Sequence, residues 1–120
     1  MEIVGIGTDI IEIERLARMV EQDPGFARRI FTKAELDYCL SKKSRSAHLA
    51  ARFAAKEAVA KAIGRSLSWQ DVELVNADGG GPIVRLSGEA RRCTEGCRVL
   101  VTVSHSRNYA TATALLVRED

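Results

Sequence analysis

The sequence predicts an α+β fold, in which helices pack against an antiparallel sheet and one long helix is central. Helical patterns gather between residues 10 and 63, whereas most strand patterns follow them. The later strand patterns come in pairs joined by turns, which is typical of hairpins. A length of 120 residues without a linker or repeat fits one domain. We therefore expect a single domain over residues 1–120 rather than a doubly wound parallel sheet.

The first strand is followed directly by a helix. IVGIG, residues 3–7, is a β-branched run with glycines at its end, so it predicts a buried strand that carries Thr8 and Asp9 at its tip. A helix is predicted over residues 10–22, because five apolar residues recur at helical spacing. They are Ile10, Ile13, Leu16, Ala17 and Val20.

Three further helices are predicted in the first half. PGFARRIF, at 24–31, begins with proline, which suits the first turn of a short helix. Thr32 followed by Glu35 is a capping box and predicts the next helix. The long helix runs over residues 45–63 and should end near Gly64.

The second half predicts four strands and a short helix. Residues 71–77 alternate like a strand, GGGP turns the chain, and residues 82–86 return as the second strand of a hairpin. A short helix is expected over residues 87–95. Two closing strands, at 98–106 and 109–117, are joined by a short turn.

Composition excludes several classes of protein. With 18 Lys+Arg and 16 Asp+Glu, the net charge of +2 does not indicate a nucleic-acid binder. No apolar run approaches a bilayer span, and MEIVGIGTDI lacks the basic start of a signal peptide. Cys39, Cys93 and Cys97 do not have zinc-site spacing, so we interpret them as reduced structural thiols. We expect a soluble cytoplasmic protein that binds neither nucleic acid nor membrane.

Two carboxylates are candidates for chemistry. Asp9, after a strand, could equally cap a helix. Glu57 could equally form a surface pair with Lys61, four residues later. Together, two carboxylates would suit Mg²⁺, and nearby Lys61, Arg52 and Lys56 would neutralise its phosphate ligands. The alternative for each cation is a solvated surface group.

The two histidines carry less information. His105 ends a predicted strand between Ser104 and Ser106, but strand neighbours point to opposite faces, so no nucleophilic triad is indicated. His105 either contacts a phosphate or is satisfied structurally. His48, on a polar part of the long helix, is interpreted as a bystander.

Three separated stretches resemble one family. GIGTDIIEIERL (5–16), RFAAKEAVAKAIG (52–64) and VSHSRNYATATAL (103–115) are similar, in this order, to the three motifs of holo-acyl-carrier-protein synthase. This is the small bacterial type of 4′-phosphopantetheinyl transferase. FTKAEL also fits, so the resemblance covers nearly the whole chain.

The resemblance implies a Mg²⁺-dependent transfer. Such enzymes move the phosphopantetheine arm of coenzyme A onto a serine of apo acyl carrier protein, leave adenosine 3′,5′-bisphosphate, and so support fatty acid biosynthesis. By resemblance, Asp9 and Glu57 hold the metal. Lys61 contacts the diphosphate and could stabilise charge on the leaving phosphate, and His105 lies near the coenzyme A phosphates. The base that accepts the serine proton is left open between Glu57 and a metal-bound water.

The resemblance also implies partners. Family members are trimers with active sites between subunits, so Arg52 and Lys56, with the basic segment 42–45, could contact the nucleotide end from a neighbouring subunit. The first helix meets the carrier protein, and residues off its apolar stripe match that docking face. They are Arg15 and Met19, with Arg18 and Arg28 as weaker candidates. Many relatives have lysine where this chain has Gly81, which leaves any contact of that lysine in doubt.

Two other functions use the same residues. A magnesium-dependent hydrolase of a nucleotide diphosphate would employ the same acids with water as the acceptor. A non-catalytic module would instead use the arginines of the first helix to dock an acidic protein. Transfer to a carrier, hydrolysis without a carrier, and binding without turnover distinguish the three.

Overall fold

A computed structural model describes residues 1–119 and has five helices, a 3₁₀ turn and five strands in that range. In chain order these are β1 (Glu2–Glu12), α1 (Ile13–Gln22), α2 (Pro24–Ile30), α3 (Lys33–Leu40), α4 (Arg45–Ile63), η1 (Trp69–Asp71), β2 (Val72–Asn76), β3 (Pro82–Leu86), α5 (Gly88–Arg92), β4 (Cys97–His105) and β5 (Tyr109–Arg118). The predicted α+β class is confirmed. None of the helices in the described part of the chain could cross a membrane.

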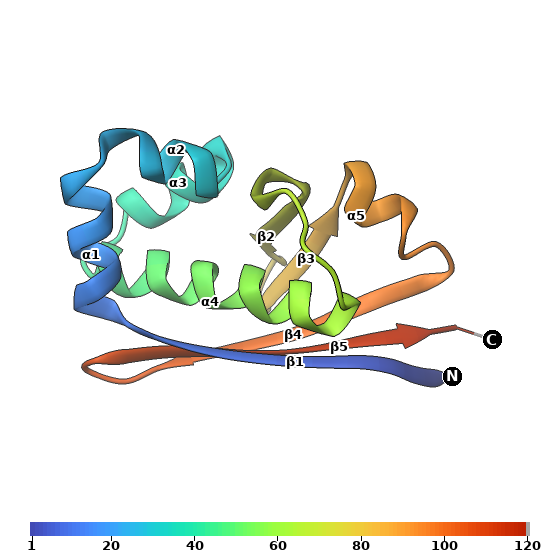
Figure 1. Ribbon diagram of the computed structural model, residues 1–120. Coiled ribbons are helices and arrows are strands. Elements are labelled where there is room, and N and C mark those ends of the chain that lie inside the picture. The colour runs from blue at the N-terminus through green and yellow to red at the C-terminus, as the bar shows by residue number, and fades with distance from the viewer. Residues whose placement is uncertain (120) are drawn as a thin grey trace.

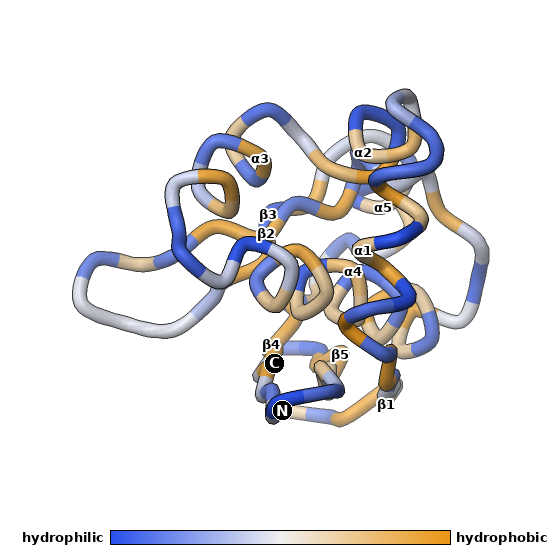
Figure 2. Tube along the Cα trace, turned by 90° about the vertical axis from the view of Figure 1, so that its left-hand side faces the viewer, coloured by the Kyte–Doolittle hydropathy of each residue, from blue (hydrophilic) through white to orange (hydrophobic). Residues whose placement is uncertain are grey.

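The molecule has three layers with α4 in the middle. A three-stranded antiparallel sheet, in the order β1-β5-β4, covers one side of α4 (Figure 1). The hairpin β2-β3 and the shorter helices lie on the other side, as the view along the sheet also shows (Figure 2). The long central helix and both predicted hairpins are therefore confirmed.

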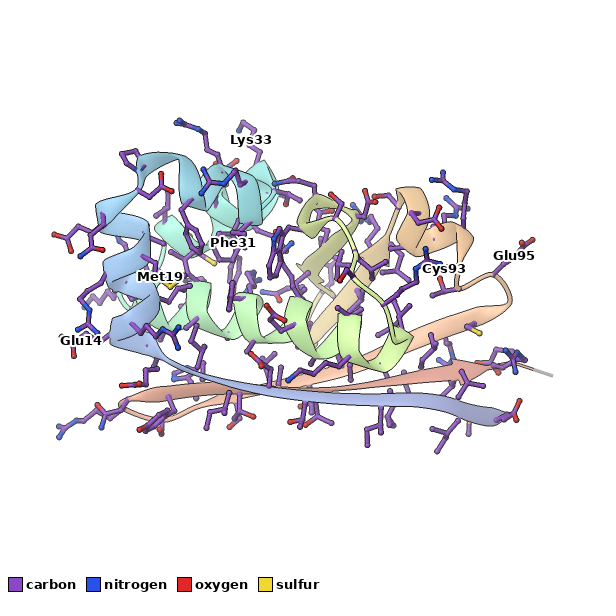
Figure 3. The ribbon with its side chains drawn as sticks, viewed as in Figure 1. Glu14, Met19, Phe31, Lys33, Cys93 and Glu95 are labelled. Carbon is purple, nitrogen blue, oxygen red and sulfur yellow. The ribbon has the colours of Figure 1, made fainter. Side chains whose placement is uncertain are left out.

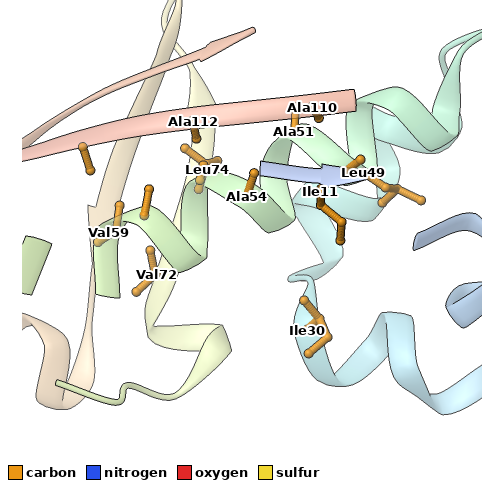
Figure 4. Close-up of a cluster of buried hydrophobic side chains, with 14 of the residues drawn as sticks. Ile11, Ile30, Leu49, Ala51, Ala54, Val59, Val72, Leu74, Ala110 and Ala112 are labelled. Atoms are coloured by element: carbon orange, nitrogen blue, oxygen red, sulfur yellow. The ribbon is translucent and has the colours of Figure 1, made fainter. Parts of the chain in front are cut away.

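Small side chains bring α4 close to the sheet. Ala54, Ala55 and Ala58 on α4 and Ala110 and Ala114 on β5 have no exposed surface. Figure 4 shows Ala110 and Ala112 beside Ala51 and Ala54. This layer of alanines places the helix backbone near the strands.

The approach of β1 to α4 requires glycine. A Cβ atom at Gly5 would lie 1.8 Å from the Ala62 carbonyl oxygen, and one at Gly7 would lie 2.0 Å from that of Ala58. Any other residue would have to push the strand away from the helix. The two glycines thus set the distance between β1 and α4, and with it the position of Asp9.

Three helix ends lie where the sequence indicates. The Asp23 side chain accepts a hydrogen bond from the Gly25 N–H at the start of α2. Both bonds of the capping box between Thr32 and Glu35 are present at the start of α3. Gly64 ends α4 with φ of 88°, a left-handed conformation that glycine adopts readily.

The extent of the first strand was predicted wrongly. β1 does not stop at residue 7 but continues to Glu12, and α1 begins only at Ile13. Its partner β5 pairs with it throughout, from Arg118 opposite Glu2 to Tyr109 opposite Glu12. Asp9 therefore lies within a strand and caps no helix. Ile10, placed on the helical core stripe by the periodicity, is instead 65% exposed on the strand.

The sheet face away from α4 is exposed and largely apolar. Ile3, Ile6 and Ile10 of β1 are 62%, 67% and 65% exposed, and Leu100 of β4 is 42% exposed. Ile6 faces Leu115 of β5, which in turn faces Leu100. We call this surface the outer sheet face. Ile6, Leu115 and Leu100 form one apolar row across the three strands, and the next row on this face is polar, with Thr8, Thr113 and Thr102. Exposed isoleucines and leucines gathered on one sheet face are typical of an interaction surface.

Candidate active site

Asp9, Glu57 and Lys61 come together where β1 runs along α4. The Lys61 ammonium donates hydrogen bonds to the Thr8 carbonyl at 2.9 Å and to Asp9 Oδ1 at 3.3 Å. Asp9 faces α4 because alternate residues of β1 share the face that packs on this helix. Glu57 lies one helical turn before Lys61 and is close enough to Asp9 for their charges to interact. Three residues predicted to act together therefore share one cluster.

The carboxyl of Glu57 is perturbed by this arrangement. Burial raises its pKa above the ordinary value of 4.5, the negative charge of Asp9 raises it further, and Lys61 opposes the shift. Two carboxylates beside one ammonium leave an excess of negative charge in a partly desolvated place. A divalent cation would balance that charge, and oxygen donors suit Mg²⁺.

A cavity of about 570 Å³ opens beside this cluster. Its wall is formed by the last turns of α4 and by the segment that follows them. The lining residues are Lys56, Glu57, Ala60, Lys61, Gly64, Arg65, Ser66, Leu67, Ser68, Trp69 and Val72. Glu57 and Lys61 thus face a space in which a ligand can sit.

His105 belongs to a second cluster, which is basic and aromatic. Its ring centroid lies 6.3 Å from that of His48, which lies 5.7 Å from the Tyr38 ring. The Arg52 guanidinium lies over the Tyr38 ring at 4.3 Å and Lys42 Nζ lies over it at 4.7 Å. Burial lowers the pKa of His48, as do the neighbouring charges of Arg52, His105 and Lys42. The sequence indicated no role for His48, because its ring neighbours Tyr38 and His105 come from other elements.

Arg52 has unused hydrogen-bonding capacity in this second cluster. Its side chain is buried, yet Nε has no partner among the described residues. Nη2 donates to Asn76 Oδ1 at a long 3.4 Å. A buried guanidinium without a carboxylate partner favours an anion as the missing partner.

The two clusters lie on opposite sides of α4. Helical residues advance by about 100° each, so Glu57 is rotated by about 180° from His48. The sheet shows the same separation, because Asp9 is on β1 and His105 is on β4, with β5 between them. One copy of the chain therefore does not bring all predicted site residues to one place.

Lys56 does not lie where the sequence analysis expected it. Its side chain is only 1% exposed and pairs with the buried Glu35 carboxylate at 2.8 Å. Its ammonium also donates to the carbonyls of Trp69 and Val72. The interpretation of Lys56 as a solvated surface group is wrong, because its side chain is buried and its donors meet protein acceptors. Its assignment as a nucleotide contact stays a prediction. Arg52, likewise buried, is not a surface group either.

The predicted docking residues are mostly exposed. Arg15 and Arg18 lie on the surface of α1, Arg28 lies on that of α2, and Met19 is half-buried. Arg18 pairs with Glu14 at 3.4 Å, and Figure 3 shows Glu14 at the outer side of α1. Arg15 has no such partner within residues 1–119. Its charge is therefore free to meet an acidic surface.

Comparison with known proteins gives one consistent family. The model of the 4′-phosphopantetheinyl transferase superfamily matches residues 5–114. The chain is 45% identical to the holo-[acyl-carrier-protein] synthase of Protochlamydia amoebophila, covering 93% of this chain and 96% of that protein. It is 49% identical to the synthase of Chlamydia trachomatis serovar D, and that match covers 92% of this chain and 97% of that protein.

A solved structure has the same fold. The crystal structure of a holo-(acyl-carrier-protein) synthase from Bacillus anthracis, in complex with coenzyme A (3′,5′-ADP), superposes with a TM-score of 0.84 at 35% identity. The match covers 99% of this chain and 100% of that one. The chain, matched in sequence and in fold over nearly its whole length, belongs to the 4′-phosphopantetheinyl transferase superfamily and, within it, to the holo-[acyl-carrier-protein] synthases.

Proposed function

We propose that this chain transfers the 4′-phosphopantetheine group of coenzyme A to a serine of apo acyl carrier protein, with Mg²⁺, and releases adenosine 3′,5′-bisphosphate. The proposal places this reaction in the cytoplasm, in support of fatty acid biosynthesis. The observation that carries it is the cluster of Asp9, Glu57 and Lys61 beside a cavity, on two of the motifs that resemble the family.

The donor set fits a magnesium ion. Asp9 and Glu57 would hold it, since Mg²⁺ is bound by one or two carboxylates and completes its shell with waters and substrate phosphates. When bound, such an ion neutralises diphosphate oxygens and thereby favours attack at phosphorus. Lys61 would then be released from Asp9 to meet the substrate.

The residues of the chain mainly position the reacting groups and neutralise the charge of the phosphates. In the proposed reaction the serine hydroxyl gives its proton to a base, Glu57 or a water, and its oxygen forms a bond to the phosphorus that bears the pantetheine arm. The bond from that phosphorus to the bridging oxygen breaks, and the bridging oxygen leaves with adenosine 3′,5′-bisphosphate. Lys61, which faces the cavity, would stabilise the charge that develops on this leaving oxygen.

The direct test is the mass of the carrier. Apo acyl carrier protein is incubated with this protein and coenzyme A, with Mg²⁺ or with excess chelator. The expected result is a mass gain of one phosphopantetheine that requires the metal. Release of free phosphopantetheine without a carrier would instead identify a hydrolase, and carrier binding without turnover would identify a docking module.

The assembly we propose is a homotrimer with active sites between subunits. The separation of the two clusters by α4 supports it, because a copy that presents the His105 cluster to the Asp9 cluster of another would complete the site. The outer sheet face supports it as well, since packing against other copies would remove its apolar side chains from water.

Mixing two inactive variants tests the shared site. We expect Glu57→Gln and His105→Ala each to lose most activity as pure proteins. Coexpressed, they should regain about a quarter of the wild-type activity, because some interfaces then combine an intact Glu57 with an intact His105. Activity no higher than that of the two parents would place the whole site within one chain. Sedimentation of each variant confirms that the assembly itself is unchanged.

Carrier docking is tested by charge reversal on α1. Arg15→Glu should raise the KM for the carrier by roughly tenfold and leave the affinity for coenzyme A unchanged, since Arg15 is exposed and remote from the cavity lining. Arg91→Glu, an exposed arginine on α5, is the matched control and should change neither value. A loss of coenzyme A binding with normal carrier binding would contradict the assignment.

A further inference from the structure

A buried ion pair lies directly behind the cavity wall. Lys56 and Glu35 approach to 2.8 Å with side chains only 1% and 0% exposed. Glu35 Oε1 also accepts from the Thr32 N–H, and Oε2 accepts from the Leu74 N–H at 2.8 Å. The pair therefore joins three elements, α3, α4 and β2. None of its atoms is part of the chemistry proposed above.

The Lys56 ammonium reaches past Glu35 to the cavity wall. It donates to the carbonyl of Trp69, the first residue of η1, at 3.0 Å and to the carbonyl of Val72, the first residue of β2 directly after η1. The Trp69 ring stacks on Phe53 of α4 with centroids 5.3 Å apart. Both Trp69 and Val72 line the cavity. Lys56, together with the stack of Trp69 on Phe53, thus ties η1 to the helix that carries Glu57.

Stability alone does not account for this pair. Burial lowers the pKa of Lys56, and the charge of Glu35 opposes that shift only in part, so the pair does not fully offset the cost of burying the ammonium. Apolar side chains of similar volume often replace such pairs without loss of stability. What an apolar side chain cannot provide is a donor for the carbonyls of Trp69 and Val72. The distinctive contribution of Lys56 is therefore geometric.

We propose that Lys56 is a positioning residue for substrate binding: through the carbonyls of Trp69 and Val72 it holds η1 in place as the wall of the coenzyme A cavity. The inference rests on the proposed function for the identity of the ligand. Glu35 pairs with Lys56 but does not itself contact either carbonyl. Loss of this tie affects how well the cavity binds coenzyme A more than it affects the transfer step.

Two substitutions separate this role from simple loss of an ion pair. Both Lys56→Met and Glu35→Gln abolish the ion pair, but only Lys56→Met removes the donor to the carbonyls of Trp69 and Val72. Even an unprotonated Lys56 in Glu35→Gln still has two N–H groups to donate. We expect Lys56→Met to raise the KM for coenzyme A and the Kd for 3′,5′-ADP about tenfold, with kcat within about threefold. Glu35→Gln should keep both constants close to the wild-type values.

Trp69 provides a spectroscopic readout, because it is the single tryptophan of the sequence. In Lys56→Met its emission should shift to the red as η1 loosens and the half-buried ring meets more water. In Glu35→Gln the emission should stay at the wild-type wavelength. Equal changes in both variants, or wild-type constants in Lys56→Met, would overturn the inference.

Folding failure of Lys56→Met is anticipated, because it leaves a buried carboxylate unpaired. In that case the double variant Glu35→Gln/Lys56→Met provides the test. It should fold because both members of the buried ion pair are replaced by neutral side chains. A raised Kd for 3′,5′-ADP in the folded double variant supports the positioning role, and a wild-type Kd overturns it. Failure of the wild type to bind coenzyme A would instead contradict the proposed function. Failure of the proposed function and failure of the positioning role are therefore distinguishable.

Discussion

Glu57→Gln is expected to lose transfer activity by about a thousandfold or more and yet to unfold at a higher temperature than the wild type at neutral pH. The loss follows because a neutral amide is a poor ligand for Mg²⁺, whose charge neutralisation contributes several kcal/mol to such reactions. The unfolding temperature rises because the variant no longer has a partly buried negative charge at residue 57 beside the charge of Asp9. Activity assays and thermal unfolding without metal measure the two effects.

The stability difference between Glu57→Gln and the wild type should increase with pH. The pKa of Glu57 is raised in the folded state, so its protonated form favours folding, and that contribution is lost as pH rises through the raised pKa. Below about 4.5 the carboxyl is protonated in both states, and the variant and wild type should differ little in stability. The difference in unfolding temperature should therefore grow as pH rises from that value towards 7.

Magnesium should reverse the order of stability. Added Mg²⁺ is expected to raise the unfolding temperature of the wild type much more than that of Glu57→Gln, because only the wild type offers both carboxylates. Glu95→Gln, an exposed carboxylate (Figure 3), is the control and should respond to the metal like the wild type. If Glu57→Gln bound Mg²⁺ and transferred phosphopantetheine normally, Glu57 would not be a metal ligand.

Gly7→Ala is expected to be, with Gly5→Ala, among the most damaging single-methyl substitutions in the chain. Its Cβ would lie 2.0 Å from the Ala58 carbonyl oxygen, and neither backbone can yield without breaking its own hydrogen bonds. We expect a loss of about 3 kcal/mol in the free energy of unfolding, at the upper end for overpacking. Any protein that still folds must move β1 outwards, which separates Asp9 from Lys61 and removes activity.

Gly81→Ala is the matched control for that prediction. A Cβ at Gly81 would meet nothing within 4 Å, and its φ is not in the left-handed region. Urea unfolding and transfer assays on both variants should find Gly81→Ala close to the wild type. Equal stability of the two variants would show that β1 can move freely relative to α4.

The sequence predicted best those elements whose signals are local. The capping box of Thr32 and Glu35, the left-handed stop at Gly64 and the hairpin around GGGP each depend on a few neighbouring residues, and all are present. The hairpin closes with Gly81 accepting from the Ala77 N–H, so the turn forms without a lysine there. The end of β1 was missed because its extension depends on pairing with β5, more than 90 residues later.

The site was predicted only in part for the same reason. Glu57 and Lys61 share a helix face by spacing alone, and the family motif adds Asp9. The burial of Lys56 could not be predicted, because its partner Glu35 looks locally like a capping residue and nothing more. The separation of the two clusters requires knowing which side of α4 meets β1 and which meets β4, and that is a property of the packed fold.

The position of α4 between the layers makes its length as important as its composition. A single residue inserted between Arg52 and Glu57 would rotate everything beyond it by about 100° and shift it by about 1.5 Å. Glu57 and Lys61 would then turn away from Asp9, and the alanines would no longer face β5. Since every side of this helix has a different neighbour, no compensating turn is available. Insertions and deletions should be tolerated in the hairpin tip around Gly80 but not within Arg45–Ile63.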